Sequence, residues 1–433
     1  MIFSIIVSIL TCLLIVLSSI LLPNIKYKKC KINLYWIIAL LGASLILIFN
    51  KLSFSEWWNS LVNKDGINPL QILILFLSMS AISIFLDEVG FFAHLASWVL
   101  KHVKKSQISL FIILYIFISL LTMFTSNDII ILTLTPFILF FCKNAQIDPK
   151  PYLVSEFIAA NTWSMIFIIG NPTNIYLASS FNIGFLDYFK IMAIPTVFTG
   201  ITEFVILFLL FRKSLFEDIK PVEVNLKPLN KIPTYIAAII LGICTLFLVI
   251  SSYINLPMYL ICASSFLILI ISILIFALLK RQKPTELGKT FTRIPYELIP
   301  FIISMFTLVL SLEKYRITGE IAKFYGKNGS TFIYGFSSAF VANLTNNIPM
   351  SVFYSSICNF ASESIKIRAI YSAIIGSNLG AFITPIGALA GIMWLSILKN
   401  HNIDYSYLDF LKYGVIVGIP ALTVALSSLL LFI

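Results

Sequence analysis

The sequence predicts an all-α polytopic membrane protein made of two inverted repeats. Each repeat is expected to hold about five transmembrane helices, one re-entrant hairpin and one broken helix. Three observations predict this fold class. Of the 433 residues, 59% are apolar and 11% are charged, with a mean hydropathy of +0.98, whereas soluble globular proteins carry roughly a quarter charged residues. The apolar residues form segments long enough to cross a bilayer. The same polar motifs occur twice.

The repeated motifs follow one order in both halves: an acid after a Ser-Met pair, a polar interruption, a second interruption containing Gly, Asn and Pro, and a closing pentapeptide. In the first half these are Asp87, 125–128, 170–174 and 186–190. In the second half they are Glu313, 345–349, 376–385 and 408–412. Amides, hydroxyls and helix breakers inside apolar sequence, present in two related halves, are typical of secondary transporters.

Each half contains a pair of apolar segments joined only by polar residues. Segments 107–124 and 129–142 flank Thr125–Asp128, and basic loops follow both outer ends. Two helices whose outer ends lie on one side of the membrane form a re-entrant hairpin. Segments 331–343 and 346–358 repeat this pattern around 345–347. Because irregular backbone at membrane depth is tolerated only beside protein or a water-filled cavity, we expect both tips to lie in a buried site.

The long segments 152–185 and 368–398 are each interrupted. Pro172 and Pro385 lack an amide hydrogen and clash with the preceding turn, so we expect each to break its helix. A simple proline kink is the alternative interpretation. A kink explains Pro172 alone, but it does not explain why a similar interruption recurs in the other half.

Orientation follows from the basic clusters, because short basic loops stay on the cytoplasmic side. These clusters lie at residues 26–31, 101–105, 212–231 and 280–293. They predict a multi-pass protein of the plasma membrane with its N-terminus outside and a cytoplasmic linker at 212–232. Residues 1–211 and 233–433 are then two repeats of opposite orientation, and the first hairpin enters from the cytoplasm and the second from outside.

Composition argues against several other classes of protein. The net charge of +11 is assigned to topology and not to nucleic-acid binding, since no binding fold surrounds the basic clusters. The six cysteines show no paired spacing that would indicate disulfides or zinc. The three histidines lie near loops. No cofactor or metal is expected.

The two hairpin tips and two broken helices should converge near the bilayer midplane. Half-helix termini supply dipole ends and free backbone groups there. The candidate substrate-binding residues are neutral amides and hydroxyls: Ser126, Asn127, Asn171, Thr173, Asn174, Thr345, Asn346, Asn347, Ser377, Asn378 and Thr384. Such a set suits a neutral polyhydroxylated solute or a small ion that sheds its water.

Asp128 is the acid at the first hairpin tip, and it is the candidate proton-coupling residue. A carboxylate at membrane depth is costly unless it is paired or protonated, and intramembrane acids are functional by default. The alternative is a helix-capping role. Its counterpart is taken to be Asn347, so the second half lacks this titratable group.

The other acids in or near apolar segments are weaker candidates. Glu156 is interpreted as an acid near the N-terminus of its helix, and Glu203 as compatible with a cavity-facing position. Asp87, Glu88 and Glu313 are interpreted as interfacial.

The motifs resemble those of one transporter family. The stretches FTSNDIIILTLTP at 124–136 and LDEVGFF at 86–92 resemble the hairpin segment of bacterial arsenite and antimonite efflux permeases. NNIP at 346–349 and GSNLGAFITPIGALAGIMWLSIL at 376–398 resemble that family's C-terminal signature. The resemblance covers roughly residues 70–430, and a wider superfamily that includes sodium/proton antiporters and carboxylate transporters shares it. It implies an elevator mechanism, in which hairpins and broken helices slide against a scaffold.

Two departures bear on the substrate. IGNPTNI at 169–175 is closer to the Gly-Asp-Pro-x-Asn pattern of the antiporter and melanosomal-transporter branches. Asn161 stands where the arsenite permeases are expected to have an acid.

The leading hypothesis is proton-coupled efflux of arsenite or antimonite. The alternative is a sodium/proton antiporter or an organic-anion transporter on the same fold, although the motifs contain no Arg or Lys to pair with a carboxylate. An intramembrane enzyme is disfavoured, because the motifs hold no zinc set, Asp pair or Ser-His or Ser-Lys dyad. The expected partners are the bilayer, a small inorganic solute and coupling protons. A soluble ATPase subunit or a homodimer is left open.

Overall fold

The computed structural model describes residues 1–21, 24–27, 30–62, 68–92, 94, 106–217, 231–251 and 254–433. The basic cluster at 101–105 and most of the predicted linker at 212–232 lie outside the described residues. So do the side chains of residues 19–32, which include the first basic cluster and Cys30.

Helices make up most of the described chain, which confirms the predicted helical class. The elements of the first half are α1 (Ile2–Leu21), β1 (Asn24–Tyr27), β2 (Cys30–Asn33), α2 (Leu34–Ile48), α3 (Phe54–Leu61), α4 (Pro69–Glu88), α6 (Gln107–Phe124), α7 (Asn127–Ala145), α8 (Lys150–Trp163), η1 (Ile168–Gly170), α9 (Pro172–Ser180) and α10 (Phe185–Leu215). The antiparallel pairing of β1 with β2 is a short addition that the sequence did not indicate.

The second half repeats this order of helices. Its elements are α11 (Lys231–Ile250), α12 (Met258–Leu279), α13 (Thr285–Arg293), α14 (Leu298–Lys314), α15 (Ile317–Tyr325), α16 (Ser330–Thr345), α17 (Asn347–Asn359), α18 (Glu363–Gly380), η2 (Pro385–Gly387), α19 (Leu389–Asn400) and α20 (Tyr407–Leu429). By length and composition, eight helical stretches of the described chain can cross a membrane, with α13 and α14 counted as one stretch.

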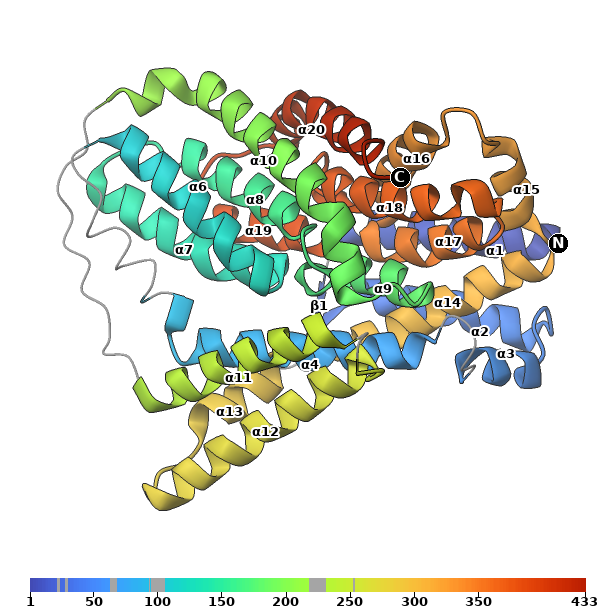
Figure 1. Ribbon diagram of the computed structural model, residues 1–433, viewed down its shortest axis with the longest axis horizontal. Helices are drawn as coiled ribbons and strands as arrows, with labels where there is room; N and C mark the ends of the chain where they lie inside the picture. The colour runs from blue at the N-terminus through green and yellow to red at the C-terminus, as the bar shows by residue number, and fades with distance from the viewer. Residues whose placement is uncertain are drawn as a thin grey trace.

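Helix contacts pair the two halves in a regular way. α2 packs against α14, and α12 packs against α4. α9 contacts α17, and α19 contacts α7, so each broken helix reaches the hairpin of the other half. α10 and α20 pack against each other. In Figure 1, α4, α11 and α12 gather below α6, α7 and α8, whereas α2 and α14 lie below α16, α17 and α18.

The helix breaks begin where the prolines predict. Pro172 is the first residue of α9, where its missing N–H costs nothing, and Pro385 begins η2. Before α9 the chain folds back on itself so closely that a Cβ on Gly170 would lie 2.3 Å from the Ser164 carbonyl oxygen. Only glycine fits this approach, because that oxygen belongs to the backbone.

One sequence interpretation was wrong. Residues 376–380 do not interrupt a helix, because they form the last turn and a half of α18. Their glycines serve packing instead. A Cβ on Gly376 would lie 2.3 Å from the Gly335 carbonyl oxygen, and one on Gly380 would lie 2.8 Å from the Ala339 Cα atom. Small residues spaced four apart on both helices therefore bring α16 and α18 into close contact.

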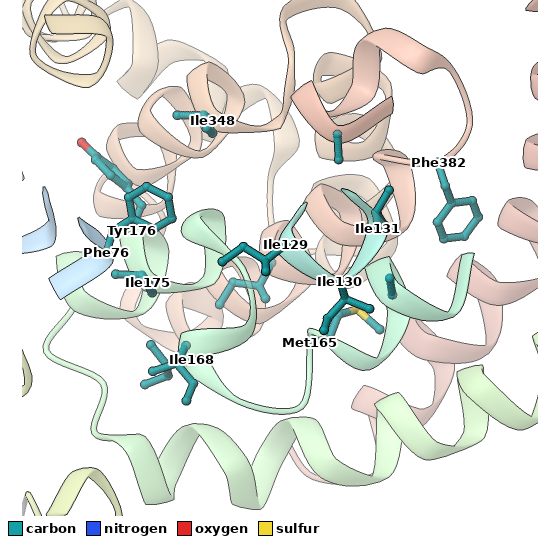
Figure 2. Packing of buried hydrophobic residues seen from close by; sticks show 14 of the residues in the cluster. Phe76, Ile129, Ile130, Ile131, Met165, Ile168, Ile175, Tyr176, Ile348 and Phe382 are labelled. Atoms are coloured by element: carbon teal, nitrogen blue, oxygen red, sulfur yellow. The ribbon is translucent and has the colours of Figure 1, made fainter. Parts of the chain in front are cut away.

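Apolar side chains surround the first break. Ile129 and Ile130 of α7 belong to the same buried apolar cluster as Met165 and Ile168 of the interrupted segment (Figure 2). Figure 2 also shows Ile348 of α17 on the far side of this cluster. The packing excludes water from the polar groups at the break, so those groups must pair with each other.

Outside the spans, α3 is tied to α14. The Lys314 ammonium donates to the Glu56 carboxylate at 2.8 Å, and the Ser53 amide N–H donates to the same carboxylate at 2.9 Å. The Ser53 hydroxyl accepts from the Glu56 amide N–H at 3.2 Å, which completes a capping box. These bonds, with Lys314 contributing most, lower the pKa of Glu56 to about 2. Because both side chains are substantially exposed, this ion pair adds little to stability.

Candidate functional site

The first hairpin turns at Thr125 and Ser126, whose extended backbone separates α6 from α7. The Asn127 side-chain amide donates to Asn161 Oδ1 of α8 at 3.0 Å, and the Asn161 amide donates to the Phe157 carbonyl at 2.8 Å. The side-chain oxygen of Asn127, Oδ1, is buried and has no hydrogen-bond partner within the described chain. The tip is therefore fixed to α8 and retains one free acceptor.

Asn378 of α18 stands at the centre of a buried polar network. Its Oδ1 accepts from Asn171 Nδ2 at 2.8 Å and from Ser164 Oγ at 3.1 Å. Its Nδ2 donates to Asn174 Oδ1 at 2.6 Å and to the Ile374 carbonyl at 2.8 Å. One amide from the second half thus holds three residues of the first break.

Two further bonds complete this network. The Thr173 and Ser377 hydroxyl oxygens lie 2.6 Å apart, and Asn174 Nδ2 donates to the Ser164 carbonyl at 2.8 Å. Five of the predicted residues therefore meet: Asn171, Thr173, Asn174, Ser377 and Asn378. We call this set, with Ser164, the central network. Its side chains are all buried.

Sequence reasoning missed Ser164 as a site residue and noted Asn161 only as a departure from a family pattern. A usable signal was present. Asn161 and Asn378 lie the same number of residues before η1 and η2, and each bonds a carbonyl of its own helix at 2.8 Å. Aligning the halves on Pro172 and Pro385 conceals this correspondence, because those prolines begin different elements.

The second hairpin forms a separate polar cluster with the second break. Asn346 Nδ2 donates to the Ile386 carbonyl at 3.1 Å, and Asn343, also missed from sequence, donates to the Gly380 carbonyl at 2.8 Å. The Thr384 hydroxyl donates to Asn343 Oδ1 at 2.6 Å. Thr345 bonds carbonyls of its own hairpin. Asn347 is buried beside this cluster, which shares no hydrogen bond with the central network within the described chain.

Asp128 lies in the first turn of α7 and is half-buried. It is not a cap, since Ser126 occupies that position, and no described residue forms a hydrogen bond or ion pair with the Asp128 carboxyl. The first residues of α7 and α17 also show that the residue assigned as the counterpart of Asp128 was wrong. Asn127 and Asn347 are the first residues of α7 and α17, so Ile348 and not Asn347 corresponds to Asp128. The second half still lacks a titratable group at this point.

Four further acids fall into two groups. Asp87 and Glu88 form ion pairs with Arg293 at 2.8 and 2.5 Å, and Asp87 also accepts from Thr133 of α7. Glu156 and Glu203 are each 0% exposed, and Glu156 is not an acid of the first turn of α8, which corrects its interpretation as an N-terminal acid. The Glu203 carboxyl accepts from the Thr162 hydroxyl at the end of α8.

No basic side chain bonds any member of the central network, and no cluster of metal-ligating residues occurs in the part of the chain that the structure describes. The site therefore offers neutral donors and acceptors. A separate cleft of about 480 Å³ opens between α4, the end of α9 and the start of α12. Asn68, Gln71, Asn182 and Asn255 line it together with apolar residues, and none of its lining residues is charged.

Comparison with known proteins identifies related membrane transporters. A family model described as "Citrate transporter" matches residues 2–368. An arsenical pump membrane protein of Escherichia coli is 27% identical over 419 residues, which cover 91% of this chain and 92% of that protein. A putative arsenical pump membrane protein of Bacillus subtilis is 26% identical over 413 residues, covering 88% and 90%.

Two solved structures share the fold at low sequence identity. The YdaH transporter of Alcanivorax borkumensis has a TM-score of 0.58 and 10% identity, covering 99% of this chain and 97% of that one. MtrF of Neisseria gonorrhoeae, described as an antimetabolite efflux pump, has a TM-score of 0.54 and 12% identity, covering 99% and 95%. Both are membrane transporters, which confirms the predicted fold class.

Proposed function

This chain belongs to the citrate transporter family and is a multi-pass membrane transporter, and from that premise we propose that it exports arsenite or antimonite across the plasma membrane in exchange for protons. The observation that carries this proposal is the composition of the central network. Asn378 bonds both Asn171 and Asn174, neighbouring hydroxyls join these amides, and no basic side chain is bonded to them.

Charge distinguishes the candidate substrates. A citrate anion carries several carboxylates, and burying them requires cations or many charge-assisted hydrogen bonds. Arsenite at neutral pH is the neutral As(OH)₃, which amides and hydroxyls can hold by hydrogen bonds alone. Relatives named as arsenical pumps match most of the chain, which supports the neutral solute.

Thiols are not needed for this binding. Cys12, Cys142, Cys244, Cys262 and Cys358 are the cysteines whose side chains the structure describes, and none belongs to the central network. An exporter must also release its solute, and binding through thiolates would slow that step.

We assign proton coupling to Asp128. Its half-buried position at a hairpin tip, with no cation bonded to it, makes binding of a proton the means of neutralising its charge. Exchange of that proton with one side of the membrane at a time would couple it to solute movement.

We further propose that residues 1–211 and 233–433 are inverted repeats joined by a cytoplasmic linker at 212–232, and that transport follows an elevator mechanism. The reciprocal contacts of α2 with α14 and of α12 with α4 support the repeat. The 480 Å³ cleft between α4 and α9 supports a boundary between scaffold and moving domain at that place.

Uptake into everted membrane vesicles tests the proposal. We expect arsenite and antimonite to accumulate when the vesicle interior is acidic. We expect no uptake of citrate or sodium under the same gradient. No ATPase is added, so accumulation shows that the chain works without one. Citrate uptake with no metalloid uptake would contradict the assignment.

The family description itself favours organic-anion transport as the second candidate function. In that case the N-terminus of α9 would supply the positive end of a helix dipole at Asn171 and Thr173. The same vesicle assay separates the two functions, because it measures both solutes under one gradient.

A further inference from the structure

Glu203 occupies a buried position in the middle of α10, against the end of α8. Its Oε1 accepts from the Thr162 hydroxyl at 2.7 Å. Its Oε2 is buried and has no hydrogen-bond partner within the described chain. A carboxyl that is kept at this depth with one oxygen unpaired is costly for the fold, which points to a functional reason for its presence.

The surroundings of Glu203 contain no cation to neutralise it. α10 packs against α6, α8, α11, α20 and η1. Tyr115 of α6 is the nearby titratable side chain, and its hydroxyl donates to the Gly200 carbonyl one turn from Glu203 at 2.7 Å. α6 and η1 carry no charged residue. The charged residues of the other elements, all but Glu156 near helix ends, are Lys150, Glu156, Asp187, Lys190, Arg212, Lys213, Lys231, Asp409 and Lys412.

The Glu203 carboxyl bonds the residue of α8 that directly follows the contact with the first hairpin. Thr162, which bonds Glu203, follows Asn161, which accepts from Asn127 at the hairpin tip. Ser164 then bonds Asn378 in the central network. A change in the charge of Glu203 therefore acts on the segment of α8 that holds both the tip and the network.

Glu156 offers a contrast within the same helix. It too is fully buried, its Oε2 lies 2.9 Å from the Thr135 hydroxyl, and its Oε1 has no partner in the described chain. However, the Thr135 hydroxyl also lies 2.6 Å from the Ile131 carbonyl, which can only accept. The single hydrogen of Thr135 is therefore shared between the Ile131 carbonyl and Glu156.

Thr162 has no such second acceptor. Its hydroxyl bonds only Glu203 among the described residues, so it can donate to a carboxylate or accept from an acid. Glu156 thus shares its threonine partner with a carbonyl, whereas the Thr162 hydroxyl is available to either protonation state of Glu203.

We propose that Glu203 is a second proton-binding site of the transport cycle, distinct from Asp128. In the conformation described here the carboxyl is sealed between α8 and α10. When solute binding or domain movement separates the end of α8 from α10, water reaches the acid, which releases its proton to that water and keeps the Thr162 hydrogen bond as a carboxylate. The inference rests on the proposed proton-coupled transport.

Proton release and flux test this site in the full-length protein. Purified protein in weakly buffered detergent solution, with a pH-sensitive dye, receives arsenite. Wild type should release protons, and Glu203→Gln should release fewer. In proteoliposomes, Glu203→Gln should lose the stimulation of arsenite flux by a pH gradient, whereas Glu203→Asp should regain part of it. The matched control, Glu156→Gln, should keep both properties, because its amide can still bond Thr135.

The possible outcomes separate the two proposals. Equal proton release and equal gradient dependence in wild type and Glu203→Gln would overturn the role of Glu203. If wild type transports arsenite with no gradient dependence, the coupling assigned under the proposed function fails, while a loss of proton release confined to Glu203→Gln would still support the site. Thermal melting identifies variants that misfold, and in that event the Glu203→Asp comparison decides between loss of fold and loss of the proton site.

Discussion

The two helix breaks share one plan and differ in chemistry. In each, an asparagine before the break bonds a carbonyl of its own helix, and a short 3₁₀ turn leads into the next helix. The first break continues as Asn171-Pro172-Thr173-Asn174, whereas the second continues as Ala388-Leu389-Ala390-Gly391. The polar side chains that begin α9 therefore have no equivalent at the start of α19.

The tip of the first hairpin also carries an ionisable group that the tip of the second hairpin lacks. The first presents Asp128 where the second presents Ile348, and two buried glutamates, Glu156 of α8 and Glu203 of α10, also belong to the first half. The second half contributes Ser377 and Asn378 from a continuous helix. The candidate site therefore takes its ionisable groups, and most of its hydrogen-bonding groups, from the first half of the chain.

The largest effect is expected at the hairpin tips. Asp128→Asn removes the titratable group and keeps its shape, so flux driven by a pH gradient should vanish while the folded protein persists. The measurement is arsenite flux in everted vesicles, with melting temperature as the control for folding. Ile348→Asn, at the corresponding place, should leave the gradient dependence intact. Gradient-driven flux in Asp128→Asn would remove this residue from the mechanism.

The next effect tests the link between the halves. Asn378→Ala deprives Asn171 and Asn174 of their Asn378 partners, and each buried polar group left unpaired costs about 1–3 kcal/mol. We expect a lower melting temperature and loss of solute binding.

The matched control for that experiment is Asn161→Ala. It removes one hydrogen bond between elements, the one that Asn127 of α7 donates to Asn161 of α8. It should destabilise the protein less than Asn378→Ala. Equal destabilisation by the two changes would show that the central network is no stronger than the tip contact.

A third experiment compares the accessibility of the two tips. In a cysteine-free background, Ser126→Cys should react with impermeant thiol reagents from the cytoplasm in the inward state, and Thr345→Cys from outside in the outward state. Solute should shift the two reactivities in opposite directions, since a ligand moves an equilibrium only by binding its states differently. Equal labelling from both faces under all conditions would contradict alternating access.

The smallest effect is expected from the cysteines. Replacing all six by Ala or Ser should preserve arsenite resistance in cells, because binding is assigned to amides and hydroxyls. Four of the described cysteines are buried, so a modest loss of stability is expected and is measured by melting. Complete loss of resistance traced to one cysteine at normal expression would reveal a thiolate ligand.

The sequence was sufficient to locate the helix breaks and hairpins, because proline and polar residues within apolar segments have few structural interpretations. It misassigned 376–380, since glycine serves both chain reversal and close packing, and only the contact with Gly335 and Ala339 distinguishes the two. Ser164 was missed because its role depends on Asn378, which is distant in the chain. The burial of Glu203 likewise depends on helices packed around it and not on its neighbours in sequence.

The central network also constrains the order in which the protein can be completed during synthesis. Asn171 and Asn378 are 207 residues apart, and the amide of the first bonds the second. At about 5–20 residues per second, a ribosome needs roughly 10–40 s to deliver Asn378 after Asn171. During that interval the polar start of α9 has no Asn378 to bond, so it must remain hydrated at the membrane surface or be sheltered by the insertion machinery. The first half therefore reaches its final packing only after the second half has been inserted.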